Sequence, residues 1–339
     1  MALTRPIHET DLSSGVCIVT PTAVPYRNAA SRLKGALESV LGAAVDVLPD
    51  DLAGEAGGRH VVALGNMMDS EFLKALYFRA YDLTDRAWPG PDGWAIRTAP
   101  HTLADVGHTI VVGVSQAEDA SAAAEALASE IEAGGAVLPY QHRVNLGRYS
   151  DLYLKPAQER LEKGDAELEL EFTSGPGDWT YMWAVSEIGM LAVQTGMVEL
   201  MRMFCRQVCH FCRTRWFERH LPDPPQIHGF LRTMLLPFTV LENHPGIPSD
   251  QREETLEAFL GIYRSTEGAG NPGFLNYVGV DQVRQNHQTM SGVDLFYGGR
   301  YFHQVHGLAE GMAWMKLAEV FFAPQMTSNK PVCDSWGHQ

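Results

Sequence analysis

Hydrogen-bonding side chains are concentrated in residues 283–307, VRQNHQTMSGVDLFYGGRYFHQVHG. Asn286, His287 and Gln288 are adjacent there, at the predicted start of a helix. Adjacent side chains at a helix start can face one ligand, and the partial positive charge of that helix end favours an anion. A capping Asn followed by a core His explains the pattern equally well. The same segment holds further polar residues, namely Arg284, Tyr297, Arg300, Tyr301, His303 and His306.

Two further groups of side chains are suited to binding a sugar acid. His228 and Arg232 are four residues apart, so a helix places them on one face, where they could hold a carboxylate. A pair of this kind is also common on an exposed helix surface. Trp183 lies among other aromatic residues at the start of a predicted helix, in GDWTYMWAVSEIGML. An aromatic ring there suits stacking on a sugar, although packing in the core explains it equally well.

Cys205, Cys209 and Cys212 form the pattern C-x3-C-x2-C. Radical S-adenosylmethionine enzymes hold an iron–sulfur cluster with this spacing, and zinc with His210 or His220 is a second possibility. However, the cysteines continue a helical stripe of apolar residues that no glycine or turn residue interrupts. Cysteine in such a stripe behaves as a small apolar residue. We therefore expect three buried cysteines, and neither a metal nor a cofactor.

Composition limits the partners of this chain. Its 339 residues include 26 Lys and Arg against 41 Asp and Glu, a formal net charge of −15 at pH 7. Such a charge repels nucleic acids and anionic membranes, so we expect neither as a partner. The opening segment MALTRPIHETDLSSG lacks the apolar core of a signal peptide, which indicates a cytoplasmic protein. Five cysteines, an odd number, argue against a disulfide framework.

Elements of two kinds must position these residues. In residues 1–150, apolar strands such as HVVALGN and TIVVGVS alternate with amphipathic helices such as YRNAASRLKGALESVLGA. This alternation predicts a small α/β sandwich domain with a largely parallel sheet, and the glycine patterns of nucleotide-binding loops are missing. Residues 151–339 predict an all-α domain of helical hairpins, so the fold class is multidomain α/β plus all-α. Its helices are expected at 179–195, 197–219, 227–242, 249–266, 287–305 and 309–323.

Three segments of the second domain resemble a known family. GMLAVQTG, NHQTMSGVDLFYGGRYF and the late CDSWGHQ, behind an α/β domain, are similar to bacterial heparinase II/III-like polysaccharide lyases. The resemblance implies an (α/α) toroid of helical hairpins with an N-terminal α/β accessory domain, and usually a C-terminal β-sandwich. Six predicted helices are fewer than a toroid needs, so we expect an incomplete toroid in a truncated chain. The family resemblance also suggests a periplasmic or secreted location, which disagrees with the cytoplasmic location expected from the opening segment.

The resemblance further implies a reaction. Such lyases cleave uronic-acid polysaccharides by β-elimination, and Asn286 and His287 would neutralise the carboxylate next to the C5 proton. A Tyr or His removes this proton, a role that falls to Tyr301 or to His338. The expected partner is an acidic polysaccharide or oligosaccharide, and no cofactor is needed. The residues that would bind it are Trp183, His228, Arg232, Gln288 and Arg300.

Two other classes of function stay open. A glycoside hydrolase relative needs two carboxylates flanking the bond, for which Glu187, Asp294 and Asp334 are available without an evident pair. An inactive carbohydrate-binding scaffold needs only the binding residues. A metal or radical enzyme that uses the three cysteines ranks below both.

Overall fold

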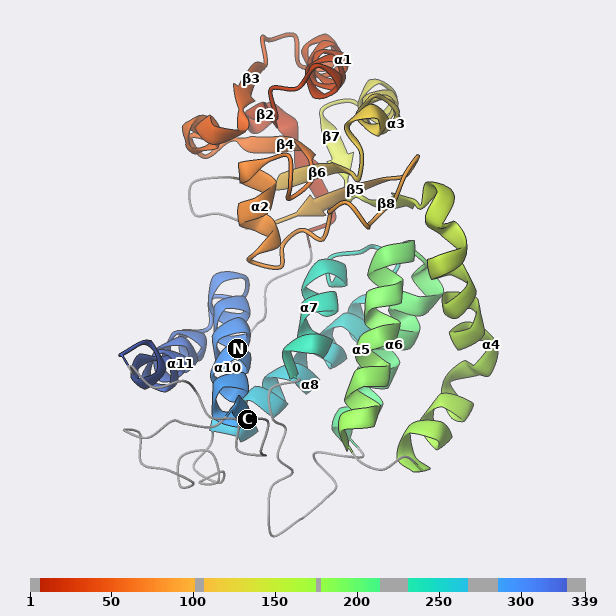
Figure 1. Ribbon diagram of the computed structural model, residues 1–339, viewed down its shortest axis with the longest axis vertical. Helices are drawn as coiled ribbons and strands as arrows, with labels where there is room; N and C mark the ends of the chain where they lie inside the picture. Colours follow the sequence, from red (N-terminus) through yellow and green to blue (C-terminus); the bar gives the residue numbers. More distant parts are fainter. Residues whose placement is uncertain (1–6, 101–106, 175–177, 214–230, 268–285, 328–339) are drawn as a thin grey trace.

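The computed structural model describes residues 7–100, 107–174, 178–213, 231–267 and 286–327. The chain forms an α/β part followed by a helical part, as the sequence predicts (Figure 1). The α/β part ends with strand β8 (His142–Asn145), and helix α4 (Ser150–Ser174) leads into the helical part. Within the described residues, no helix combines the length and apolarity needed to cross a membrane.

A six-stranded sheet forms the centre of the α/β part, in the order β3-β2-β4-β6-β5-β8. The first four strands of this order are parallel, and β5 and β8 add to the edge in antiparallel pairing. A short antiparallel pair, β1 (Glu9–Asp11) and β7 (Val137–Pro139), stands apart from it. The remaining strands are β2 (Val16–Thr20), β3 (Asp46–Pro49), β4 (His60–Gly65), β5 (Trp94–Ala99) and β6 (Thr109–Val114).

The alternation of side chains along the strands gives the sheet two buried faces. One face, which includes Ile96 of β5, packs with helices α1 (Val24–Leu41) and α3 (Ala120–Gly134) in one core. The other face packs with α2 (Glu71–Tyr77), a short helix that Ser70 caps by accepting a hydrogen bond from Leu73 N at 3.2 Å. Both faces are covered, which explains why the central parallel strands are almost entirely apolar.

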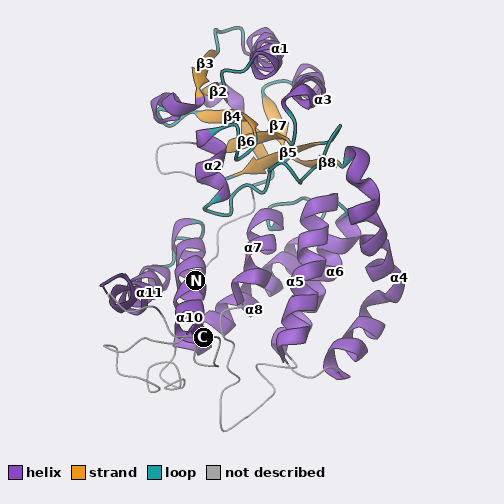
Figure 2. Cartoon of the chain, in the orientation of Figure 1, coloured by secondary structure: helices purple, strands orange, loops and turns teal. Residues whose placement is uncertain are grey.

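The helical part is built from consecutive helices that reverse direction at each turn (Figures 1 and 2). Gly196 and Gly307 take left-handed backbone conformations (φ 71° and 67°) in the turns after α5 and α10. The apolar faces of the helices meet in one continuous core. The helices after α4 are α5 (Asp178–Thr195), α6 (Val198–Phe211), α7 (Leu231–Leu241), α8 (Ser249–Glu267), α10 (Asn286–Gln304) and α11 (Ala309–Thr327).

Helix α4 is a correction to the sequence analysis, which predicted no helix between residues 150 and 178. Pro156 lies inside α4, and Gly164 breaks its regular geometry with a φ of 71° and a ψ of 168°. The helix therefore consists of two pieces joined at a kink, and the apolar pattern does not run continuously through it.

The helical part meets the sheet at the ends of its helices. His142 Nε2 of β8 donates to Val193 O near the end of α5, at 3.0 Å. Tyr140 OH donates to Val240 O near the end of α7, at 2.6 Å. The ends of α5 and α7 therefore face the α/β part, and their first residues lie at the opposite end of the helical part (Figure 1).

Candidate functional site

Helix α10 carries five of the predicted site residues, and the structure places them at its two ends. Asn286, His287 and Gln288 form its first turn, while Arg300 and Tyr301 lie in its last. With a rise of 1.5 Å per residue, fourteen residues of helix separate Asn286 from Arg300 by about 21 Å. The predicted catalytic and binding residues of this segment therefore do not converge on one sugar. The side chains of the first turn lie outside the described residues, as do His228 and His338.

Tyr301 does not occupy the position of an exposed base. Its side chain is buried, and its OH donates to Glu242 Oε2 at 2.6 Å. Burial and the neighbouring Glu242 carboxylate raise the pKa of Tyr301 well above its ordinary value. A phenol held protonated in this way, at the far end of α10 from Asn286, cannot remove the C5 proton of a sugar bound at Asn286.

Glu242 is the centre of a buried polar cluster next to Tyr301. Arg252 Nη2 and His306 Nε2 each lie 3.4 Å from Glu242 Oε2. His306 Nε2 also lies 3.1 Å from Tyr301 OH. The carboxylate is thus surrounded by a guanidinium, an imidazole and a phenol inside the helical part, where an unpaired charge would be costly, while Arg252 Nε has no acceptor.

Asp294 holds the beginning of α7 rather than a substrate. Its carboxylate accepts hydrogen bonds from Leu231 N at 3.3 Å and from Arg232 N at 3.1 Å, and Arg232 Nη1 lies 3.4 Å away. The first N–H groups of a helix lack partners within the helix, so a carboxylate there acts as a cap. Burial raises the pKa of Asp294 to about 7, against the opposing effect of Arg232. The predicted substrate residue Arg232 is therefore engaged with a buried partner.

The other predicted residues of the helical part lie on α5. Trp183 has 58% of its surface exposed, so it is not a core residue. Glu187, one turn later, accepts a hydrogen bond from Arg160 Nη2 of α4 at 2.8 Å. Asp294 of α10 is buried against the start of α7, and Glu187 is in an ion pair, so these two described candidates form no pair of carboxylates for a hydrolase. Asp334 lies outside the described residues.

The three cysteines are buried on α6 and at its end, which confirms the prediction made from the helical stripe. Burial raises the pKa of Cys205 to about 12 and that of Cys209 to about 11. Cys209 Sγ lies 3.6 Å from Thr255 Oγ1. Among the described residues, no three His, Cys, Asp or Glu side chains are placed to hold a metal ion. Cys205 and Cys212 belong to the core of the helical part, where a thiol packs as a small apolar group.

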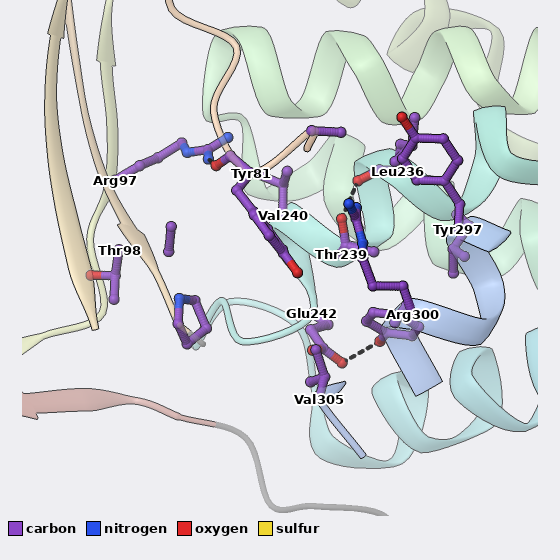
Figure 3. A pocket seen from close by; sticks show the side chains of 15 residues that line it. Tyr81, Arg97, Thr98, Leu236, Thr239, Val240, Glu242, Tyr297, Arg300 and Val305 are labelled. Carbon is purple, nitrogen blue, oxygen red and sulfur yellow. Dashed lines mark hydrogen bonds between the residues drawn. The ribbon is translucent and has the colours of Figure 1, made fainter. Parts of the chain in front are cut away.

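A pocket opens between the α/β part and the helical part (Figure 3). Its cavity volume is about 30 Å³, and its mouth opens to solvent. Residues 80–81 and 97–100 line one side, and residues of α7 and α10 line the other. Arg300 lies here, with its guanidinium 4.9 Å from the ring centres of both Tyr81 and Tyr297. Among the predicted substrate-binding residues whose side chains the structure describes, Arg300 lines this pocket, which has aromatic walls.

Arg97 is a functional candidate that the sequence analysis missed. It lies in β5, lines the same pocket and is only 2% exposed. Its Nη2 donates to Tyr81 O, while its Nε and Nη1 have no hydrogen-bond partner. A charged residue in the otherwise uncharged strand WAIRTA was the available indication.

In comparisons with known proteins, no family model, no curated protein and no solved structure matches this chain.

Proposed function

We propose that this protein binds a uronic-acid polysaccharide and cleaves it by β-elimination. In this proposal the helical hairpins form part of an (α/α) toroid, and the reaction takes place at the end of the helical part that faces away from the α/β part. The supporting observation is the alternation of helix direction, which brings the first turns of α5, α7 and α10 to that end (Figure 1). Asn286 begins α10 there.

The reaction requires a group that stabilises negative charge on the sugar's carboxylate. A C5 proton is acidic enough to leave only when the charge that develops on the carboxylate is stabilised by hydrogen bonds. Asn286 and His287 supply an amide and an imidazole at the first turn of a 19-residue helix, whose N-terminal end favours negative charge. The base then takes the C5 proton, a C4–C5 double bond forms, and the C4–O bond breaks with its electron pair on the leaving oxygen, which takes up a proton.

The base in this proposal is His338 and not Tyr301. Tyr301 is buried and hydrogen-bonded to Glu242 at the other end of α10. His338 remains the candidate that the resemblance indicates for this role.

Trp183 is the candidate for contact with the sugar rings. It lies in the second turn of α5, near the same end of the helical part as Asn286, and most of its surface is exposed. An exposed indole ring offers the flat apolar face on which a sugar can stack. Arg232 and Gln288 belong to the first turns of α7 and α10 at this end, although Arg232 is bound to Asp294, and His228 lies outside the described residues.

The test is an elimination assay over a panel of uronate polymers, followed by the ultraviolet absorbance of the unsaturated product. We expect the native chain to form this product from at least one polymer. Asn286→Ala should lower the rate by about 100-fold or more, because one lost donor to a developing anion costs that much. Asn28→Ala, on the exposed side of α1, is the matched control and should act as the native chain does. No product from any polymer, or full activity of Asn286→Ala, contradicts the proposal.

A carbohydrate-binding scaffold without catalysis is the second candidate. It is favoured by the burial of Tyr301, which removes one of the two predicted bases from reach of Asn286. Retention of the chain on an immobilised uronate polymer, without any unsaturated product, would support binding alone. Loss of that retention in Trp183→Ala would locate the binding surface on α5.

A further inference from the structure

The pocket between the two parts of the protein contains two guanidinium groups from different elements. Arg97 reaches it from β5 and Arg300 from α10 (Figure 3). Among the described residues, neither side chain forms an ion pair with a carboxylate. Two positive charges without such partners, at one pocket, favour an anionic ligand.

Arg97 has unused hydrogen-bonding capacity. A guanidinium carries five N–H donors, one of them on Nε and two on each terminal nitrogen. Only the contact from Nη2 to Tyr81 O is made, and Nε and Nη1 have no acceptor. Burying such donors without acceptors is unfavourable, so the group is suited to a ligand that brings oxygen atoms.

The negative groups near the pocket are already occupied. Asp82 is buried near Arg97 and accepts hydrogen bonds from Thr84 N at 3.2 Å and Thr84 Oγ1 at 2.9 Å. Glu242 lines the pocket but is bound by Arg252 and by Tyr301 OH. With Glu242 balanced by Arg252, and Asp82 balanced by one of the two pocket arginines, the groups facing the pocket retain a positive charge.

The walls of the pocket suit the body of a ligand as well as its charge. Arg300 lies between the rings of Tyr81 and Tyr297 and is further held by donation from its Nη2 to Arg79 O at 2.5 Å. Tyr81 OH donates to Gln304 Oε1 at 3.2 Å. The guanidinium and the two rings are therefore fixed before any ligand enters, which lowers the entropic cost of binding.

We propose that this pocket between the α/β and helical parts binds a small carboxylate-bearing molecule through Arg97 and Arg300, with Tyr81 and Tyr297 against its body. A planar carboxylate matches the fixed geometry of a guanidinium. The site lies at the opposite end of α10 from Asn286, so it goes beyond the proposed elimination reaction. Because the ligand would contact both parts, its binding stabilises their junction.

The experiment measures binding of glucuronate to the full chain by calorimetry and by thermal denaturation, at constant ionic strength. Glucose is the neutral control and inorganic phosphate the non-carboxylate anion. We expect glucuronate to bind and to raise the melting temperature, while glucose does neither. Phosphate should bind more weakly than glucuronate, because it has no ring to lie against Tyr81 and Tyr297.

Arg300→Gln and Arg97→Lys should each weaken glucuronate binding by about tenfold or more, since Lys keeps the charge but loses the planar group. Arg264→Gln is the matched control, because Arg264 pairs with Glu310 on the helical surface, and it should bind as the native chain does. Arg300 is partly exposed, so its variant is expected to fold, which circular dichroism checks. Unchanged affinity in a folded Arg300→Gln overturns the proposal.

Equal binding of glucose, stronger binding of phosphate, or no binding of glucuronate would also overturn it. Glucuronate binding is measured without polymer, and elimination is measured without glucuronate. Asn286→Ala, which should lose elimination, should still bind glucuronate with native affinity. The two proposals can therefore fail separately.

Discussion

Asp294 makes the stability of this protein depend on pH in a direction opposite to that of most carboxylates. Burial raises its pKa from 3.8 to about 7, although Arg232 and two backbone N–H groups favour the charged form. Between these two values the folded chain holds a proton at this site that the unfolded chain has released. The unfolded state therefore binds fewer protons, and the free energy of unfolding falls as the pH rises from about 4 to about 7.

The size of the effect follows from the two pKa values. Each pH unit between them changes the free energy of unfolding by about 1.4 kcal/mol. Relative to a side chain that stays neutral, Asp294 lowers the free energy of unfolding by about 1.7 kcal/mol at about pH 5 and by about 4 kcal/mol at about pH 8. In Asp294→Asn this pH-dependent cost is removed, although the amide cannot accept every hydrogen bond that the carboxylate accepts. That loss of acceptors changes little with pH.

The assay is urea unfolding of the native chain and of Asp294→Asn at about pH 5 and about pH 8. We expect the stability of the variant, relative to the native chain, to rise by about 2 to 3 kcal/mol between the two conditions. Asp151→Asn, an exposed residue in the first turn of α4, controls for the loss of one negative charge. The same difference at both pH values would refute the argument, because it would mean that Arg232 keeps Asp294 ionised in the folded state throughout.

Two further perturbations test the packing around α10. Tyr301→Phe removes the OH that donates to Glu242, and should lower the free energy of unfolding by about 1 to 3 kcal/mol in urea; an unchanged value would mean that Glu242 is satisfied without it. Gly298→Ala places a Cβ on the Tyr263 ring and should cost about 2 kcal/mol or more in the same measurement. Gly35→Ala, in a helix with nothing within 4 Å of the added Cβ, should instead stabilise the chain by up to about 1 kcal/mol, and a loss there would refute the steric explanation.

The helices and strands could be predicted because each depends on a local pattern. Apolar residues at helical spacing, with Gly and Pro between them, identified α5, α7, α8, α10 and α11, most of their ends to within a few residues. Helix α4 was missed because Pro156 and Gly164 interrupt the pattern that defines a helix from sequence alone. Local periodicity is therefore enough to predict the coarse division into an α/β part and a helical part.

The grouping of site residues could not be predicted in the same way. Closeness along residues 283–307 suggested closeness in space, but a helix converts fourteen residues into about 21 Å. The partner of Tyr301 is Glu242, which precedes it by 59 residues. No local pattern indicates such a pair, so the burial of Tyr301 depends on tertiary packing that the sequence pattern does not predict.

The strand pattern places Arg97 on one face of the sheet, and the tertiary structure decides what surrounds it there. Its neighbour Ile96 faces the core beneath α1 and α3, so alternation alone directs Arg97 to the opposite face of the sheet. Helix α2 packs with β2, β4 and β6 on that face, and Arg97 lies on the next strand, β5, where residues of α7 and α10 form the other side of the pocket. The guanidinium is buried there, and two of its nitrogens have no acceptor. The junction thus buries a charge whose unused donors favour an oxygen-rich partner, which is why the pocket at this junction, and not the strand itself, is the place to look for a ligand.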